Sequence, residues 1–326
     1  MTYRVFLALG AIALVAVCFP ESAHAWTPGT HVYLGESLLA NLHLLPPATA
    51  ELLRAFPFDF LYGNIAADSS IAKKYAPVGR HCHYWHVGQE IHDEAKNDAL
   101  RAFGLGYLCH LAADTVAHNY FVPRQLVLTA STASVGHAYW ESRVETHLGS
   151  AYARAAKELI QGDTRQADRH LARIISPTLF SVGTNRRLFK GLVHLAETRG
   201  FQSGLKAAVG RSRWSLTDMD VERHLGLSYD YMVDLLASET PVPRQLDPSG
   251  EQPLHVAKTV RRHVLQEGAR TRPGRLLDAA EEHFGLPGEQ LTFWPERVRP
   301  LPWKAPAPAR ERREAEAYAK ESGSRQ

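Results

Sequence analysis

The segment from Leu105 to Phe121 constrains the fold most strongly, because it is almost entirely apolar or small and yet carries three groups that can bind a metal. These groups, His110, Asp114 and His118, are spaced four residues apart. A helix turns by ~100° per residue, so the three positions drift only about 80° in total and leave one face. The segment therefore predicts a buried helix with a ligand-bearing face.

A second pair with the same spacing follows in the chain. His137 and Glu141 lie on a predicted helix from Ser134 to Ile160, which Gly162 ends. Buried metal sites on helical scaffolds are built from ligand-bearing helices that face one another. We expect the two helices to share one centre.

The pattern of apolar residues predicts an all-α fold, because convincing runs of alternating apolar residues are missing. A hydrophobic content of 45% supports a sizeable core. The expected architecture is a multi-helix bundle around a buried metal site, with a helical C-terminal extension. The other expected helices are His31–Leu44, Ala48–Ala55, Asn97–Phe121 ended by Pro123, Arg165–Ile175, Asn185–Thr198, Gln202–Val209, Asp218–Ala237, Pro253–Glu267 and Pro273–Phe284.

Proline and glycine clusters between 241 and 250 mark a linker and suggest the domain boundaries. We expect a helical domain over residues 26–240, a helical extension over 241–299 and a disordered tail over 300–326. The net charge of +3 is too small to indicate nucleic-acid binding, so no stable nucleic-acid partner is expected.

The first 25 residues have the composition of a secretory signal peptide. Arg4 supplies the positive start, an apolar run follows from Val5 to Phe19, and Ala23-His24-Ala25 is a small-x-small cleavage site. Cleavage there makes Trp26 the mature N-terminus and places the protein in the periplasm or outside the cell. A lipoprotein modified at Cys18 ranks second. No later segment is apolar for long enough to cross a bilayer.

Two cysteines, Cys82 and Cys109, remain after that cleavage. Each directly precedes a histidine that is a candidate ligand, His83 and His110. Two interpretations stay open: a disulfide that fixes the metal site, and two buried free thiols.

The length of the central helix favours several metal ions over one. At 1.5 Å per residue, His110 and His118 lie ~12 Å apart, whereas a Zn–N bond is only ~2 Å long. Asp114 lies midway, and the two oxygens of a carboxylate can contact two ions. Rows of ions that clamp a phosphate recur in phosphatases and nucleases.

Candidate partners for these three ligands come from other segments. His137 and Glu141 can join His118, while His83 and Asp68 can join His110. His31 and the terminal amine of Trp26 can join Asp114, because a terminal amine with a pKa near ~8 loses its proton readily. His81 and His86 compete with His83, since all three lie in one short cluster. His147 and Glu145 are candidates for contacts that orient the ligands.

The order of these motifs resembles the bacterial zinc-dependent phospholipase C family. The matching features are Trp at the mature N-terminus, Thr-His, Gly-Asn-Ile-Ala-Ala-Asp, His-Tyr-Trp, His-x3-Asp with a following His, and His-x3-Glu. The resemblance covers about Trp26 to Gly149 and implies a helical fold with three zinc ions, shared with S1/P1-type nucleases. It implies three groups of ligands: Trp26, His31 and Asp114; Asp68, His83, His110 and Asp114; and His118, His137 and Glu141.

Two departures from the family pattern concern substrate binding. The chain beyond Gly149 does not resemble the membrane-docking domain of the toxin members. Ser69 also follows Asp68 where the phosphatidylcholine-cleaving members have an aromatic residue.

The function implied by the resemblance is hydrolysis of a phospholipid or another phosphodiester by zinc-activated water, with peripheral contact to a membrane. Zinc lowers the pKa of bound water to ~7. Asp68 is the candidate catalytic carboxylate that orients or deprotonates this water.

Two alternatives remain. One is a nuclease or a phosphomonoesterase on the same centre, and a nuclease needs aromatic side chains on which bases stack. The candidates for that stacking are Tyr84, Trp85, Tyr139 and Trp140. The other alternative is an exported structural protein in which zinc only holds the helices together.

Overall fold

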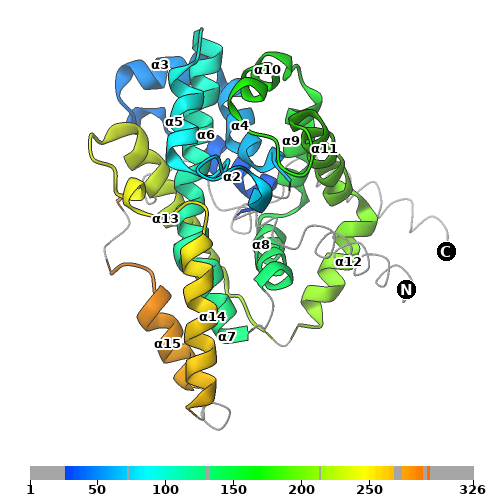
Figure 1. Ribbon diagram of the computed structural model, residues 1–326, viewed down its shortest axis with the longest axis vertical. Coiled ribbons are helices and arrows are strands. Elements are labelled where there is room, and N and C mark those ends of the chain that lie inside the picture. Colours follow the sequence, from blue (N-terminus) through cyan, green and yellow to red (C-terminus); the bar gives the residue numbers. More distant parts are fainter. Residues whose placement is uncertain are drawn as a thin grey trace, which may run out of the picture.

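The computed structural model describes residues 26–71, 73–129, 133–212, 214–267, 274–288 and 292–293, and every regular element in these ranges is a helix (Figure 1). The all-α prediction is confirmed. The first half of the chain forms α2 (Pro28–Leu39), η1 (Leu42–Leu44), α3 (Pro47–Ala55), α4 (Pro57–Ala66), η2 (Ala67–Ser69), η3 (Lys73–Tyr75), α5 (Trp85–Asp93), α6 (Asp98–Val116), the π-helical turn η4 (Ala117–Phe121), α7 (Val122–Thr129), α8 (Ala133–Leu148) and α9 (Ser150–Gln161).

The second half continues in the same manner, close to the bounds expected from the sequence. Its elements are α10 (Arg165–Ile174), α11 (Val182–Glu197), α12 (Arg199–Gly210), α13 (Asp218–Ala237), η5 (Val242–Gln245), α14 (Glu251–Gln266) and α15 (Gly274–Phe284). The expected signal peptide (1–25) and disordered tail (300–326) lie outside the described residues. The division at residue 240 stays a prediction. Within the described ranges, none of the helices has the length and apolar character needed to cross a membrane.

Helix α6 is the centre of the molecule. Its start is fixed by Asn97, whose side chain accepts a hydrogen bond from the backbone N–H of Leu100 at 3.0 Å. Almost every residue after Leu100 is buried, and α4, α5 and α13 pack against it (Figure 1). A helix buried on all sides belongs to the core of a bundle, so any polar group on it must find its partners inside the protein.

Two glycines allow α4 and α6 to approach each other closely. A Cβ atom on Gly63 would lie 2.1 Å from the carbonyl oxygen of Phe103, and one on Gly106 would lie 2.0 Å from that of Phe60. The two backbones are therefore in direct contact. Since η2 continues directly from α4, this contact also brings Asp68 towards the ligand face of α6.

The predicted end of the central helix at Pro123 is wrong. The chain passes through the π-helical turn η4 and continues as α7 to Thr129. Proline has no N–H and its ring crowds the carbonyl four residues earlier in an α-helix. The wider π turn, in which Val122 N–H donates to the oxygen of Ala117, relieves this crowding directly before the proline.

The predicted helix from Ser134 to Ile160 is in fact two helices. The break is at Gly149, whose φ of +85° is a conformation that residues with a Cβ rarely adopt. Helix α9 turns away there and packs against α2 and α11. Helix α8, which carries His137 and Glu141, contacts α2 and α7 instead.

The contact between α4 and α6 predicts a large effect of a single methyl group. We expect Gly106→Ala to destabilise the protein by about 2–3 kcal/mol, because the new Cβ meets backbone that can move only if the helices separate. The control is Gly191→Ala in α11, where a Cβ meets no atom within 4 Å and helix propensity predicts stabilisation by up to ~1 kcal/mol. Urea denaturation measures both. Equal stability of the two variants would contradict the close packing of α4 on α6.

Candidate metal centre

Asp114 is the midpoint of a fully buried polar cluster on α6. Its side chain has no exposed surface, and the same holds for His110 one turn earlier. The two oxygens of Asp114 face different groups. Oδ1 lies 3.1 Å from Nε2 of His31, while Oδ2 lies 3.1 Å from Nε2 of both His83 and His110. One carboxylate thus joins two sets of imidazoles, as expected of a bridging ligand.

Asp68 completes the group around His83 and His110. It lies in η2, and its Oδ1 is 3.5 Å from Nε2 of His83 and 3.9 Å from Nε2 of His110. The ring of His31 stacks on that of His110 with centroids 3.9 Å apart. The potential ligand atoms of His31, Asp68 and His110 lie within 4.8 Å of one another, as do those of His83, His110 and Asp114.

A third group lies beside the first two. His118, on the π turn, faces His137 of α8 with ring centroids 5.2 Å apart at 89°. Nε2 of His137 is 2.6 Å from Oε1 of Glu141 one turn later. The rings of His83 and His118 are 6.4 Å apart, so this group adjoins the Asp114 cluster. All three side chains are almost completely buried.

Trp26 is anchored next to Asp114. Its indole Nε1 donates to the carbonyl oxygen of Ala113 and to Oγ of Ser228, both at 3.1 Å, and its ring is fully buried against Phe121. The anchored indole fixes the start of the described chain beside the helix turn that carries Asp114. The structure therefore brings all nine candidate ligands of the sequence into one region, although their roles as ligands stay predictions.

Three hydrogen bonds orient the imidazoles, and the sequence pattern did not reveal them. Nδ1 of His110 is 2.8 Å from the carbonyl oxygen of Asn64, and Nδ1 of His118 is 2.7 Å from that of Pro248. Nδ1 of His83 is 3.2 Å from Sγ of Cys82. In each case Nδ1 is occupied, so Nε2 faces the centre, as in protein metal sites where a second contact fixes the ring. Carbonyl partners carry no sequence signal because any residue supplies one.

Lys73 is a further residue that the sequence analysis missed. Its side chain is buried, and Nζ donates to Oδ1 of Asp68 at 3.0 Å. Burial lowers the pKa of this amine, but the negative charges of Asp68, Cys82 and Asp114 together outweigh burial and the pKa is raised. The lysine is therefore a cation inside the centre. A lysine five residues after a candidate ligand gives no signal without knowledge of the turn between them.

Burial and neighbouring charge shift the titration of the cluster strongly. Burial, followed by repulsion from His110, lowers the pKa of His31 to about 4, and burial also lowers that of His118 to about 4. Burial raises the pKa of Asp114, but His110 and His31 outweigh it and hold that pKa well below its usual range. Burial raises the pKa of Glu141 well above its usual value, and the negative charges of Asp68 and Asp114 add to this. His31 and His118 are thus neutral at pH 7, the form that binds a metal.

The donor set fits zinc. Neither oxygen of Asp114 nor Nε2 of His118 receives a well-directed hydrogen bond from any residue that the structure describes, although all are buried. Buried polar atoms without such bonds are costly unless another partner satisfies them. Imidazole nitrogens and carboxylate oxygens are the ligands that zinc takes in catalytic sites.

Several alternatives from the sequence can now be decided. Cys82 and Cys109 are both free buried thiols, so the disulfide interpretation is wrong. His81 is only partly buried, and its Nδ1 accepts the backbone N–H of His83, while His86 is exposed. His83 is therefore the histidine of that segment that reaches the cluster.

The proposed orienting roles of Glu145 and His147 find no support. His147 contacts Asp218 at the surface, with Nδ1 2.8 Å from Oδ1. Glu145 is buried and its side chain interacts with that of Thr27. Asn64, Pro248 and Cys82 contact Nδ1 of the imidazoles instead.

The segment that contains most of these residues matches a known family. Residues 30–177 match the sequence model described as zinc dependent phospholipase C. This part of the chain belongs to the zinc-dependent phospholipase C family. No curated protein and no solved structure matches the chain significantly. The phospholipase C segment includes every candidate ligand except Trp26, and its family supports zinc as the metal of the cluster.

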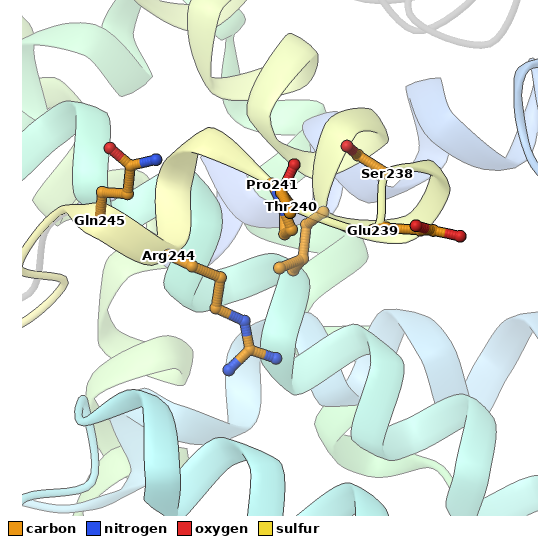
Figure 2. Close-up of a pocket in the computed structure, with 7 residues that line it drawn as sticks. Ser238, Glu239, Thr240, Pro241, Arg244 and Gln245 are labelled. Atoms are coloured by element: carbon orange, nitrogen blue, oxygen red, sulfur yellow. The ribbon is translucent and has the colours of Figure 1, made fainter.

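A surface hollow of about 520 Å³ lies elsewhere, between the end of α13 and η5 (Figure 2). Its walls include Ser238 to Pro241 and Arg244, and no histidine. The guanidinium of Arg244 stacks 4.8 Å from the ring centre of Trp85 and donates to Oε1 of Gln89 at 2.5 Å. These contacts hold η5 against α5, which explains the position of Arg244 in the wall of the hollow. Because none of the candidate ligands lines the hollow, it is not the candidate site.

Gly250 offers a test of the third ligand group. Its φ is +73°, and a Cβ there would lie 2.8 Å from the ring of His118. We expect Gly250→Ala to displace His118 and to reduce the zinc content by one ion per chain, with loss of stability by roughly 1–2 kcal/mol from the backbone conformation. Elemental analysis of purified protein measures the zinc.

The matched control is Gly149→Ala. Gly149 also has positive φ, at +85°, but a Cβ there meets no atom within 4 Å. It should lose similar stability and keep its zinc. Equal zinc in both variants would show that the Pro248–Gly250 segment does not position His118.

Proposed function

We propose that this protein is an exported zinc-dependent hydrolase of phosphodiesters that acts on phospholipids in the manner of a phospholipase C. The observation that carries the proposal is the position of Asp114, with one oxygen 3.1 Å from His31 and the other 3.1 Å from His83 and His110. This arrangement lies within a segment of the zinc-dependent phospholipase C family. The nuclease and the structural protein remain alternatives to be tested.

Three groups of side chains are proposed to hold three zinc ions. The first consists of Trp26, His31 and Asp114, the second of Asp68, His83, His110 and Asp114, and the third of His118, His137 and Glu141. Bound zinc would supply hydroxide at neutral pH and would neutralise the charge on the phosphate oxygens. The buried walls around the cluster keep bulk water away, which strengthens every charge interaction within it.

Asp68 is the proposed catalytic carboxylate. It is fully buried in η2, with Oδ1 3.5 Å from Nε2 of His83 and 3.9 Å from Nε2 of His110. A carboxylate fixed in this way can orient the attacking water and accept its proton. His81 lies beside His83 at a ring distance of 5.8 Å and is partly exposed, which puts it at the edge of the centre.

The aromatic residues proposed for base stacking give the nuclease alternative little support. Trp140 is 1% exposed, and one face of Trp85 is covered by Arg244. The guanidinium of Arg143 lies 5.8 Å from the ring centre of Tyr139, and the ring of Tyr84 lies 5.2 Å from that of His81. Stacking of a base needs an open aromatic face. Lipid phosphodiesters are therefore the favoured substrate class.

Removal of zinc should abolish hydrolysis. We expect treatment with a strong chelator to stop release of the phosphorylated headgroup from phosphatidylcholine or phosphatidylinositol vesicles, and added zinc to restore it. Asp114→Asn should lose activity by about 10³-fold or more, because one amide oxygen cannot bridge two ions. Single-stranded DNA serves as the competing substrate: cleavage of DNA without cleavage of lipid would favour the nuclease. Activity that persists in fully zinc-free protein would exclude the proposal.

Export is proposed to create a metal ligand. If cleavage before Trp26 frees its amine to bind zinc with His31 and Asp114, protein that begins at Trp26 should hold one zinc more than protein with Met or a short tag before Trp26. The tagged form should also lose activity. A tag at the C-terminus provides the control. Equal zinc and equal activity in all three forms would remove the Trp26 amine from the centre.

A further inference from the structure

Lys73 makes two contacts that bear directly on metal binding. Its ammonium lies 3.0 Å from Oδ1 of Asp68 and 3.1 Å from Nε2 of His83, and its side chain is 2% exposed. Lysine is almost never buried without a partner. Both partners here belong to the same proposed zinc group, so the position of this lysine is tied to the centre.

The direction of the hydrogen bond between Lys73 and His83 follows from the chemistry of the groups. An ammonium has donors and no acceptor, so Lys73 donates and Nε2 of His83 accepts through its ring lone pair. The other ring nitrogen, Nδ1, lies 3.2 Å from Sγ of Cys82.

A zinc ion needs the same lone pair. Imidazole nitrogen has one lone pair, and zinc binds along it at ~2.0–2.1 Å. Nε2 of His83 already lies within 3.1 Å of Nε2 of His110 and of Oδ2 of Asp114, the other atoms proposed to hold this ion. An ammonium directed at Nε2 and an ion bound to Nε2 exclude each other by space and by charge.

We propose that Lys73 competes with zinc for His83 and Asp68, so that binding of this ion requires the ammonium to swing away. The inference rests on the zinc centre of the proposed function and adds a residue that none of its ligand groups contains. The ion at Asp68, His83, His110 and Asp114 binds more weakly than these four ligands alone would allow.

The Lys73 ammonium also has a role in the protein before zinc binds. Asp68 and Asp114 are both fully buried, and two carboxylates in one buried cluster repel each other. A cation of the chain at 3.0 Å from Asp68 offsets part of that repulsion. The protein can then fold before it meets zinc, which suits a chain whose metal centre is assembled from segments far apart in the sequence.

The test compares Lys73→Met with wild type in the mature full-length chain, using zinc titration in competition with a chromogenic chelator. We expect one zinc ion to bind about tenfold more tightly or more in Lys73→Met, since a hydrogen bond to a charged group is strong enough to shift a binding constant by that factor. The other ions should keep their affinities. Where the metal-free variant fails to fold, the rate at which the chelator removes zinc from loaded protein gives the same comparison, with slower release expected.

The matched control is Lys157→Met. Lys157 also pairs with a carboxylate, with Nζ 2.8 Å from Oε2 of Glu197, but this pair joins α9 to α11 outside the centre. Its zinc affinities should equal those of wild type. The proposal is overturned if Lys73→Met binds zinc no more tightly than wild type, or if both variants gain equally. Failure of wild type and Lys73→Met alike to bind any zinc would overturn the proposed function as well.

Discussion

Burial of the Asp114 carboxylate inside α6 is the constraint on which the rest of the structure depends. An isolated carboxylate in an apolar interior costs several kcal/mol or more unless it is paired. Here three imidazole nitrogens approach its two oxygens at 3.1 Å, and they come from α2, from the segment before α5 and from α6 itself. Segments distant in the sequence must therefore meet at one helix turn. The family to which residues 30–177 belong provides the reason for retaining such a costly group, namely a metal.

The C-terminal half takes part in this arrangement, although it carries none of the candidate ligands. Pro248 accepts the Nδ1 proton of His118, and Asn119 donates to the carbonyl oxygens of Thr115 and Asp247 at 2.7 and 2.8 Å. Ser228 on α13 contacts the indole of Trp26. Asp247 and Pro248, which the sequence assigns to a linker, thus support the centre from outside. The division expected at residue 240 stays a prediction, and Pro248 and Asp247 beyond it contact His118 and Asn119 before it.

Much of the centre could be predicted because its ligands are side chains at regular spacing. Histidine and aspartate four residues apart on an apolar helix lie on the same face of that helix. Inside a bundle, such a face meets the ligand-bearing residues of neighbouring helices. The parts that could not be predicted depend on backbone and tertiary contacts. Any residue could supply the carbonyl groups that Asn64 and Pro248 provide, and the contact of Lys73 with Asp68 depends on the course of the backbone between them. The continuation of the helix past Pro123 was missed for a related reason, since a π turn has no clear sequence pattern.

The π turn at His118 connects the local geometry of the helix to the number of ions it can serve. In a regular α-helix His118 would continue the row of His110 and Asp114, and Pro123 would crowd the carbonyl of Asn119. The ring of His118, on the π turn, faces His137 on α8 with the ring centroids 5.2 Å apart. The side chain of Asn119 donates to the carbonyl oxygen of Thr115 within this irregular turn. Such turns are frequent at functional sites because one extra residue redirects a side chain without breaking the helix. Here the continuous helix carries ligands of two neighbouring groups, with His110 and Asp114 before the π turn and His118 on it.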